Sequence, residues 1–109
     1  MESSSSYDAI AFCVYILFSS KDLLLYIGYT RNIEERIKNH NSGKTKSTAP
    51  RRPLDLIFCE FYLFEADARG RESYFKTTAA KKAIKLMLSG TLLHLGYKAS
   101  AGVEVISDD

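Results

Sequence analysis

The first apolar run of the chain, residues 10–18, is rich in β-branched and aromatic side chains. A run of this length and composition is typical of a buried strand. A polar segment, residues 19–22, separates it from a second apolar run, residues 23–27. Two strands joined by a loop of four residues predict a β-hairpin in which Phe18 lies opposite Leu23.

This hairpin register determines which side chains share a face of the sheet. Tyr15 falls directly opposite Tyr26, so we expect the two phenols on the same face. The other face is apolar throughout, lined by Val14, Ile16, Leu25 and Ile27. A slip of the register by one residue would place the two tyrosines on opposite faces.

The residues after the hairpin have the pattern of a short helix. Asn32 is a typical N-cap, and Gly43 suits the position just past the C-terminus. Residues three and four apart share a helix face, which groups Ile33, Arg36, Ile37 and His40. A stripe that begins with isoleucine should be buried, yet half of it is a cation and an imidazole. Such a conflict between pattern and chemistry is typical of a functional site.

Two further segments complete the expected architecture. Residues 54–64 are nearly all apolar and predict a third strand paired with the hairpin, and residues 66–77 predict a helix. On that helix Glu72 shares a face with Ala68 and Phe75, where an apolar residue is expected. We therefore predict an α+β fold, a small three-stranded antiparallel sheet flanked by helices.

A last helix is expected over residues 79–89, capped by Thr78 and ended by Gly90. Its inward residues should be Ala83, Leu86 and Met87. Beyond it, residues 103–106 have the composition of a short strand. The expected organisation is a flexible tail at 1–9, one domain at 10–90, and a C-terminal extension at 91–109.

Charge adds a candidate binding segment. The net charge of +2 and the pI near 8.5 are only mildly basic. Within nine residues that contain no acid, however, the chain carries Lys44, Lys46, Arg51 and Arg52. We expect an exposed loop over residues 42–53, either as a nucleic-acid contact or as an ordinary solvated loop.

The remaining composition bounds the setting. At 109 residues, with 46% apolar and 26% charged residues, the chain is expected to be one globular domain. Cys13 and Cys59 lie in apolar runs without metal-ligand spacing, which favours reduced thiols and a cytoplasmic protein. No apolar run reaches the roughly 18 residues that span a bilayer, so no membrane partner is expected.

Five polar groups occur where their elements should be apolar: Tyr15, Tyr26, Arg36, His40 and Glu72. Each has a structural explanation of its own, and Arg36 with Glu72 could form a buried ion pair in a plain interaction module. Together they suit phosphoryl chemistry on a polyanion. A carboxylate can hold a divalent metal ion, and a guanidinium can brace phosphate oxygens.

These residues resemble the GIY-YIG nuclease domain family over roughly residues 12–87. The second signature is intact as Tyr26-Ile27-Gly28, whereas the first reads Cys13-Val14-Tyr15 and keeps only its tyrosine. The resemblance implies metal-dependent cleavage of DNA, branched or damaged DNA in repair included. A non-catalytic nucleic-acid-binding domain on the same fold is the alternative.

The resemblance also implies a role for each group. Glu72 would be the ligand for Mg²⁺ (or Mn²⁺), and Arg36 would stabilise charge on the phosphoryl group. Tyr15 and Tyr26 would line the site, and which of them acts on the attacking water is left open. His40 would assist that proton transfer or contact the leaving side.

This arrangement requires the later helix to dock beside the first one. Specificity would come from the basic loop, or from a protein partner or a second copy of the chain.

Overall fold

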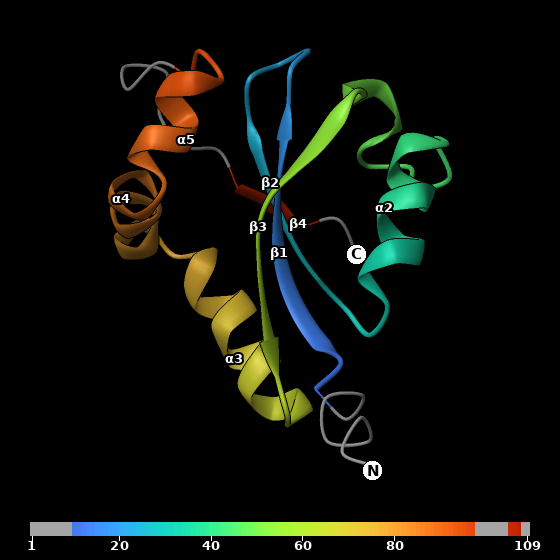
Figure 1. Ribbon diagram of the computed structural model, residues 1–109, viewed down its shortest axis with the longest axis vertical. Coiled ribbons are helices and arrows are strands. Elements are labelled where there is room, and N and C mark those ends of the chain that lie inside the picture. The colour runs from blue at the N-terminus through green and yellow to red at the C-terminus, as the bar shows by residue number, and fades with distance from the viewer. Residues whose placement is uncertain (1–9, 98–104, 108–109) are drawn as a thin grey trace, which may run out of the picture.

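A hairpin between β1 (Phe12–Ser19) and β2 (Leu25–Thr30) forms the centre of the sheet. β3 (Leu54–Tyr62) pairs antiparallel with the other side of β1, and the short β4 (Val105–Ser107) pairs parallel with β2. The sheet order is therefore β3-β1-β2-β4. These features belong to a computed structural model that describes residues 10–97 and 105–107 (Figure 1). The tail expected at residues 1–9 lies outside the described residues.

The helices cover both faces of this sheet (Figure 1). α2 (Ile33–Asn41) lies on one face. The opposite face carries α3 (Glu65–Phe75), α4 (Thr78–Met87) and α5 (Ser89–His94). The predicted α+β class with three antiparallel strands is thus confirmed, and β4 extends the sheet by one short parallel strand.

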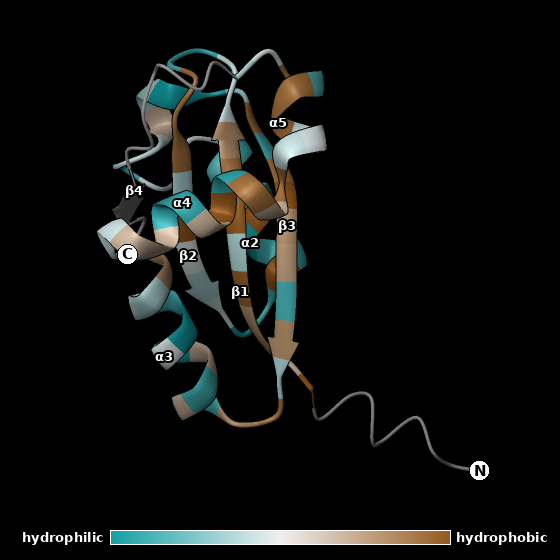
Figure 2. Ribbon diagram, turned by 90° about the vertical axis from the view of Figure 1, so that its left-hand side faces the viewer, coloured by the Kyte–Doolittle hydropathy of each residue, from teal (hydrophilic) through white to brown (hydrophobic). Residues whose placement is uncertain are grey.

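Two apolar cores result, one on each face of the sheet. The α2-side core contains Cys13, Tyr15, Leu17, Tyr26 and Leu54, against which Ile33 and Ile37 pack. The α3-side core includes Val14, Ile16, Phe18, Leu25, Ile27, Ala68, Phe75, Ala80, Ile84 and Leu92. Figure 2 looks onto the α3 side, where the strands behind the helices are largely hydrophobic. Successive side chains of β1 and β2 point to opposite faces of the sheet, so this one hairpin contributes residues to both cores.

The hairpin register differs from the predicted one by two residues. The observed pairs include Phe18–Leu25, Leu17–Tyr26 and Tyr15–Gly28. Leu23 belongs to the loop, because its φ of 63° lies in the left-handed region that strands do not use. A shift of two residues keeps every side chain on its face. Tyr15 and Tyr26 therefore share a face as predicted, but as diagonal neighbours rather than as a directly opposed pair.

The prediction of which residues of α4 face the core was wrong. Ala80 and Ile84 are buried, whereas Leu86 is 80% exposed and Met87 is 45% exposed. Thr77, not Thr78, caps the helix, since its hydroxyl accepts a hydrogen bond from the Ala80 amide at 3.2 Å. Apolar residues occur on several sides of this helix, so the sequence pattern does not show which side faces the core. Gly90, expected to end the helix, lies inside α5.

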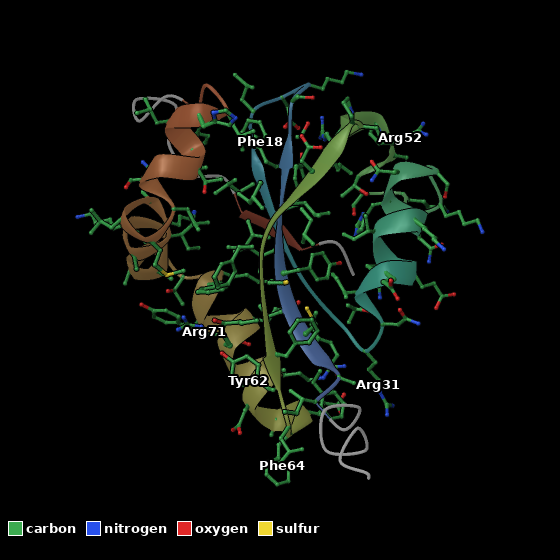
Figure 3. All side chains as sticks on the ribbon, in the orientation of Figure 1. Phe18, Arg31, Arg52, Tyr62, Phe64 and Arg71 are labelled. Carbon is green, nitrogen blue, oxygen red and sulfur yellow. The ribbon has the colours of Figure 1, made fainter. Side chains whose placement is uncertain are left out.

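β3 forms one edge of the sheet, and β4 forms the other. Several of its apolar side chains are exposed, including Leu56 at 41% and Phe61 at 47%. Phe64, just past its end, is 64% exposed and points away from the sheet (Figure 3). β4, in contrast, covers the outer edge of β2 over Leu25–Ile27.

The cap signals at α2 are confirmed. Asn32 accepts a hydrogen bond from the Glu35 amide at 3.1 Å, and Gly43 follows the helix with a φ of 83°. A Cβ at Gly43 would also lie 2.9 Å from the guanidinium carbon of Arg52. The positive φ is therefore the main reason for glycine at this position, since the exposed Arg52 side chain is flexible and can move aside.

Gly43→Ala is expected to lower the free energy of unfolding by about 1–2 kcal/mol, because alanine disfavours a positive φ. Gly70→Ala is the matched control. Gly70 lies within α3, and a Cβ there would meet no atom within 4 Å. We expect Gly70→Ala to raise the free energy of unfolding by about 0.5–1 kcal/mol. Urea denaturation measures both, and equal effects of the two substitutions would contradict this account of Gly43.

Candidate active site

The α2 side of the sheet holds a buried polar contact between the hairpin and the helix. The hydroxyl of Tyr15 lies 3.1 Å from Nε2 of His40, and both side chains are completely buried. Tyr15 comes from the middle of β1, and His40 comes from the last turn of α2. The predicted helical stripe thus brings its imidazole to one of the two predicted tyrosines.

The loop after α2 reaches the other side of the same imidazole. Oγ1 of Thr48 lies 2.7 Å from Nδ1 of His40, and Thr48 is completely buried. Sequence reasoning missed Thr48, because a threonine among basic and small polar residues carries no signal of burial. The loop was expected to be exposed throughout, and at this position that expectation is wrong.

The environment of His40 favours the neutral imidazole. Burial, with the nearby positive charge of Arg36 as a second cause, lowers the pKa of His40 to about 4. Arg36 is half-buried, and its guanidinium forms no ion pair or hydrogen bond among the described residues. Its guanidinium is therefore a cation beside the Tyr15–His40 pair that no carboxylate of the described chain neutralises.

This lowered pKa predicts a loss of stability in mild acid. As pH falls through 6.5, His40 in the unfolded chain binds a proton, while folded His40 stays neutral until about pH 4. Proton binding stabilises the unfolded state, so the free energy of unfolding falls between these two values. The difference between 6.5 and about 4 corresponds to about 3 kcal/mol, at 1.36 kcal/mol per pKa unit.

Urea denaturation at pH 7, 6, 5 and 4 tests this prediction. His40→Gln should remove that part of the pH dependence, whereas His94→Gln should retain it, because His94 is exposed. The prediction fails if the wild type and His40→Gln show the same dependence on pH.

Tyr26 has a different polar partner. Its hydroxyl donates a hydrogen bond of 2.5 Å to Oδ2 of Asp22 in the hairpin loop, and Nε of Arg51 lies 3.5 Å from the same oxygen. Partial burial works against ionisation of Asp22. The hydrogen bonds from Tyr26 and from the Leu24 amide outweigh it, so the pKa of Asp22 lies below its ordinary value. The two signature tyrosines therefore bond to chemically different groups, an imidazole and a carboxylate.

Glu72 lies on the other side of the sheet. It is 5% exposed on α3, between Ala68 and Phe75 of the α3-side core, as its helical spacing predicted. Its Oε2 forms an ion pair with Nζ of Lys76 at 3.0 Å. The expectation that this helix docks beside the first is wrong, because α2 and α3 cover opposite faces (Figure 1). The structure brings Tyr15, His40 and Arg36 together, but it shows no contact between them and Glu72.

This placement also excludes the ion pair between Arg36 and Glu72 that a plain interaction module would use. The acid on α3 pairs with a lysine one turn further along its own helix. A second ion pair of α3 involves Arg71, which bonds Glu60 of β3 at 2.6 Å and lies close to Tyr62 (Figure 3).

The chemistry of Glu72 fits a hard divalent cation that the protein holds through a single carboxylate. Mg²⁺ is often bound by one or two carboxylates, with waters and substrate phosphates as its other ligands. Oε1 of this buried carboxylate has no hydrogen-bond donor among the described residues. No group of three or more potential ligands occurs within residues 10–97 and 105–107. A binding site formed by protein side chains alone is therefore not expected in that part of the chain.

The basic loop lies on the α2 side, next to the C-terminal end of that helix (Figure 1). Its four cations are all exposed: Lys44, Lys46, Arg51 and Arg52. Arg52 lies at the outer end of the molecule (Figure 3), where its Nε donates a hydrogen bond to the Ala49 carbonyl. A positive, accessible segment thus borders the Tyr15–His40 pair.

Two observations concern the redox state of the cysteines and the possibility of a membrane-spanning helix. Both cysteines are free thiols, and burial together with the neighbouring Cys59 raises the pKa of Cys13 to about 12. None of the helices within the described ranges has the length and apolar character needed to cross a bilayer.

Comparison with known proteins identifies a matching domain family and several similar proteins. A model of the GIY-YIG catalytic domain matches residues 11–85. A UPF0213 protein of Clostridium perfringens is 38% identical over 86 residues, which cover 78% of this chain and 91% of that protein. A UPF0213 protein of Staphylococcus haemolyticus is 41% identical over 75 residues, 68% and 90% of the two chains. UPF0213 protein YazA of Bacillus subtilis is 41% identical over 69 residues, 62% and 70% of the two chains. No solved structure matches the chain.

Proposed function

Since the chain belongs to the GIY-YIG catalytic domain family, a family of nuclease fold, we propose that it is an endonuclease that hydrolyses DNA phosphodiester bonds with a divalent metal ion. The observation that carries this proposal is the hydrogen bond of 3.1 Å between Tyr15 and His40, beside the unneutralised charge of Arg36. A buried phenol on a neutral imidazole is a route for a proton, and a cation beside it suits a phosphate.

The chemistry follows from these contacts. His40 is neutral at pH 7, so its imidazole can accept the hydroxyl proton of Tyr15. As that proton moves to His40, the Tyr15 oxygen takes one from the attacking water. Arg36 stabilises the charge that develops on the phosphate oxygens.

Glu72 is the residue that we propose for holding Mg²⁺ or Mn²⁺. When bound, such an ion supplies Lewis-acid stabilisation of phosphate oxygens. The exposed cations of the basic loop, Lys44, Lys46, Arg51 and Arg52, would contact the phosphate backbone of DNA.

A cleavage assay tests the proposal. Supercoiled plasmid, single-stranded, branched and damaged DNA are incubated with the protein in Mg²⁺, in Mn²⁺ or in EDTA. We expect nicking that requires metal and that is lost in Tyr15→Phe, which removes the hydroxyl but keeps the ring. Absence of cleavage on the whole panel, with protein shown to be folded, would contradict the proposal. The same panel tests whether branched or damaged DNA is among the substrates.

A non-catalytic DNA-binding domain is the second candidate, and burial favours it. Tyr15, Tyr26 and His40 are each 0% exposed, and Glu72 lies on the opposite face. This candidate expects salt-sensitive DNA binding that survives Glu72→Gln, with no cleavage in any metal. Fluorescence anisotropy across a salt series measures the DNA binding that both candidates expect, and loss of one loop cation should reduce the salt slope by about 1. The cleavage assay separates the two candidates.

A further inference from the structure

Thr48 is a buried polar residue to which the proposed chemistry assigns no role. It lies within the basic loop, but its side chain is completely buried and its Oγ1 lies 2.7 Å from Nδ1 of His40. The loop is folded so as to place it there. The Thr45 carbonyl accepts hydrogen bonds from the amides of Thr48 and Ala49, which closes a tight turn directly before η1 (Ala49–Arg51).

The direction of these hydrogen bonds follows from the number of protons available. The Thr48 hydroxyl has one proton, and its Oγ1 lies 3.5 Å from the Thr45 carbonyl, a contact in which only the hydroxyl can donate. With its proton directed to that carbonyl, Oγ1 accepts the contact of 2.7 Å from Nδ1–H of His40. A neutral imidazole has one N–H only, so Nε2 presents a lone pair to the Tyr15 hydroxyl.

We propose that Thr48 is a positioning residue that holds the imidazole proton of His40 on Nδ1, so that Nε2 accepts the hydrogen bond of Tyr15. The role of Thr48 in cleavage rests on the proposed nuclease function, whereas the tautomer of His40 does not. Without the Thr48 oxygen, Nδ1 has lost the acceptor that holds its proton. The proton then moves to Nε2, the tautomer that histidine prefers in water, where it is donated to the Tyr15 oxygen and leaves no lone pair to accept the phenol proton.

The tautomer is measured directly by NMR of the full chain labelled with ¹³C and ¹⁵N in histidine. Ring carbon and nitrogen shifts differ between the Nδ1–H and Nε2–H forms. The chain has two histidines, and His94→Gln assigns the exposed one. At pH 7 we expect the Nδ1–H form for His40 in the wild type. The Nε2–H form in the folded wild type would overturn the proposal, and this measurement needs no variant at position 48.

Two variants complete the test. Thr48→Val keeps the shape and removes the hydroxyl, and we expect His40 to change to the Nε2–H form. Thr48→Ser restores the hydroxyl, and we expect the Nδ1–H form to return. A folded Thr48→Val protein that retains the Nδ1–H form would overturn the proposal.

DNA cleavage is a second readout, and it separates the positioning role of Thr48 from the proposed nuclease function. If the wild type cuts DNA, Thr48→Val should lower kcat about 10–100-fold with little change in KM, and Thr48→Ser should recover most of it. An unchanged kcat in Thr48→Val contradicts the positioning role. If the wild type cuts no DNA at all, the nuclease function fails, while the NMR result still decides what Thr48 does to His40.

Discussion

Glu72→Gln is expected to abolish metal-dependent DNA cleavage, with a loss of at least about 1,000-fold, and to leave the fold intact. A catalytic metal contributes several kcal/mol of charge stabilisation, and each 1.36 kcal/mol is a factor of ten in rate. Glutamine keeps the volume of the buried side chain and an oxygen that can accept the hydrogen bond of Lys76, which lies 3.0 Å from the native carboxylate. Only the negative charge that would hold the ion is lost.

Glu65→Gln is the matched control for this experiment. Glu65 lies on the same helix and also pairs with a cation four residues later, Arg69, at 3.2 Å, but it is exposed. The Glu65→Gln substitution should therefore leave cleavage nearly unchanged. Mg²⁺ or Mn²⁺ should raise the melting temperature of the wild type and of Glu65→Gln, but not that of Glu72→Gln. Wild-type cleavage by Glu72→Gln would remove this residue from the proposed site.

Arg36→Ala is expected to reduce cleavage by about 100–1,000-fold, the usual effect of removing one group that stabilises transition-state charge. Lys38→Ala removes the same charge from an exposed position of α2 and should reduce cleavage far less. Equal losses in the two variants would mean that Arg36 acts only through the general attraction of positive charge for DNA.

Arg36→Ala also has a readout that does not depend on activity. Arg36 contributes to the lowered pKa of His40, so its removal should raise that pKa toward 6.5, as followed by an NMR titration. Lys38→Ala should leave the pKa of His40 unchanged. A His40 pKa that is the same in wild type and Arg36→Ala would contradict the placement of the guanidinium beside the imidazole.

The parts of the fold that have local signatures could be predicted from the sequence. Asn32 and Gly43 mark the ends of α2 by capping chemistry that involves only nearby backbone groups. The alternation in β1 predicted which residues share a face. The register could not be predicted, because Leu23 adopts a left-handed conformation in the loop, where glycine or asparagine would have signalled the turn.

The candidate site was predictable in its members but not in its arrangement. Arg36 and His40 were identified because their spacing put charge on an apolar stripe, and the structure places both beside the Tyr15 contact. Which face of the sheet a later helix covers depends on long-range packing, and no local pattern shows that Glu72 lies opposite the tyrosines. Thr48 becomes buried only when the loop folds against α2.

The two edges of the sheet differ, and this difference limits how copies of the chain could associate. β4 covers part of the outer edge of β2, whereas the outer edge of β3 pairs with no other described strand. Open edges are where sheets recruit further strands. β3 offers nine residues at its edge and β4 offers three, so a strand added by a second copy would find its longer partner along β3.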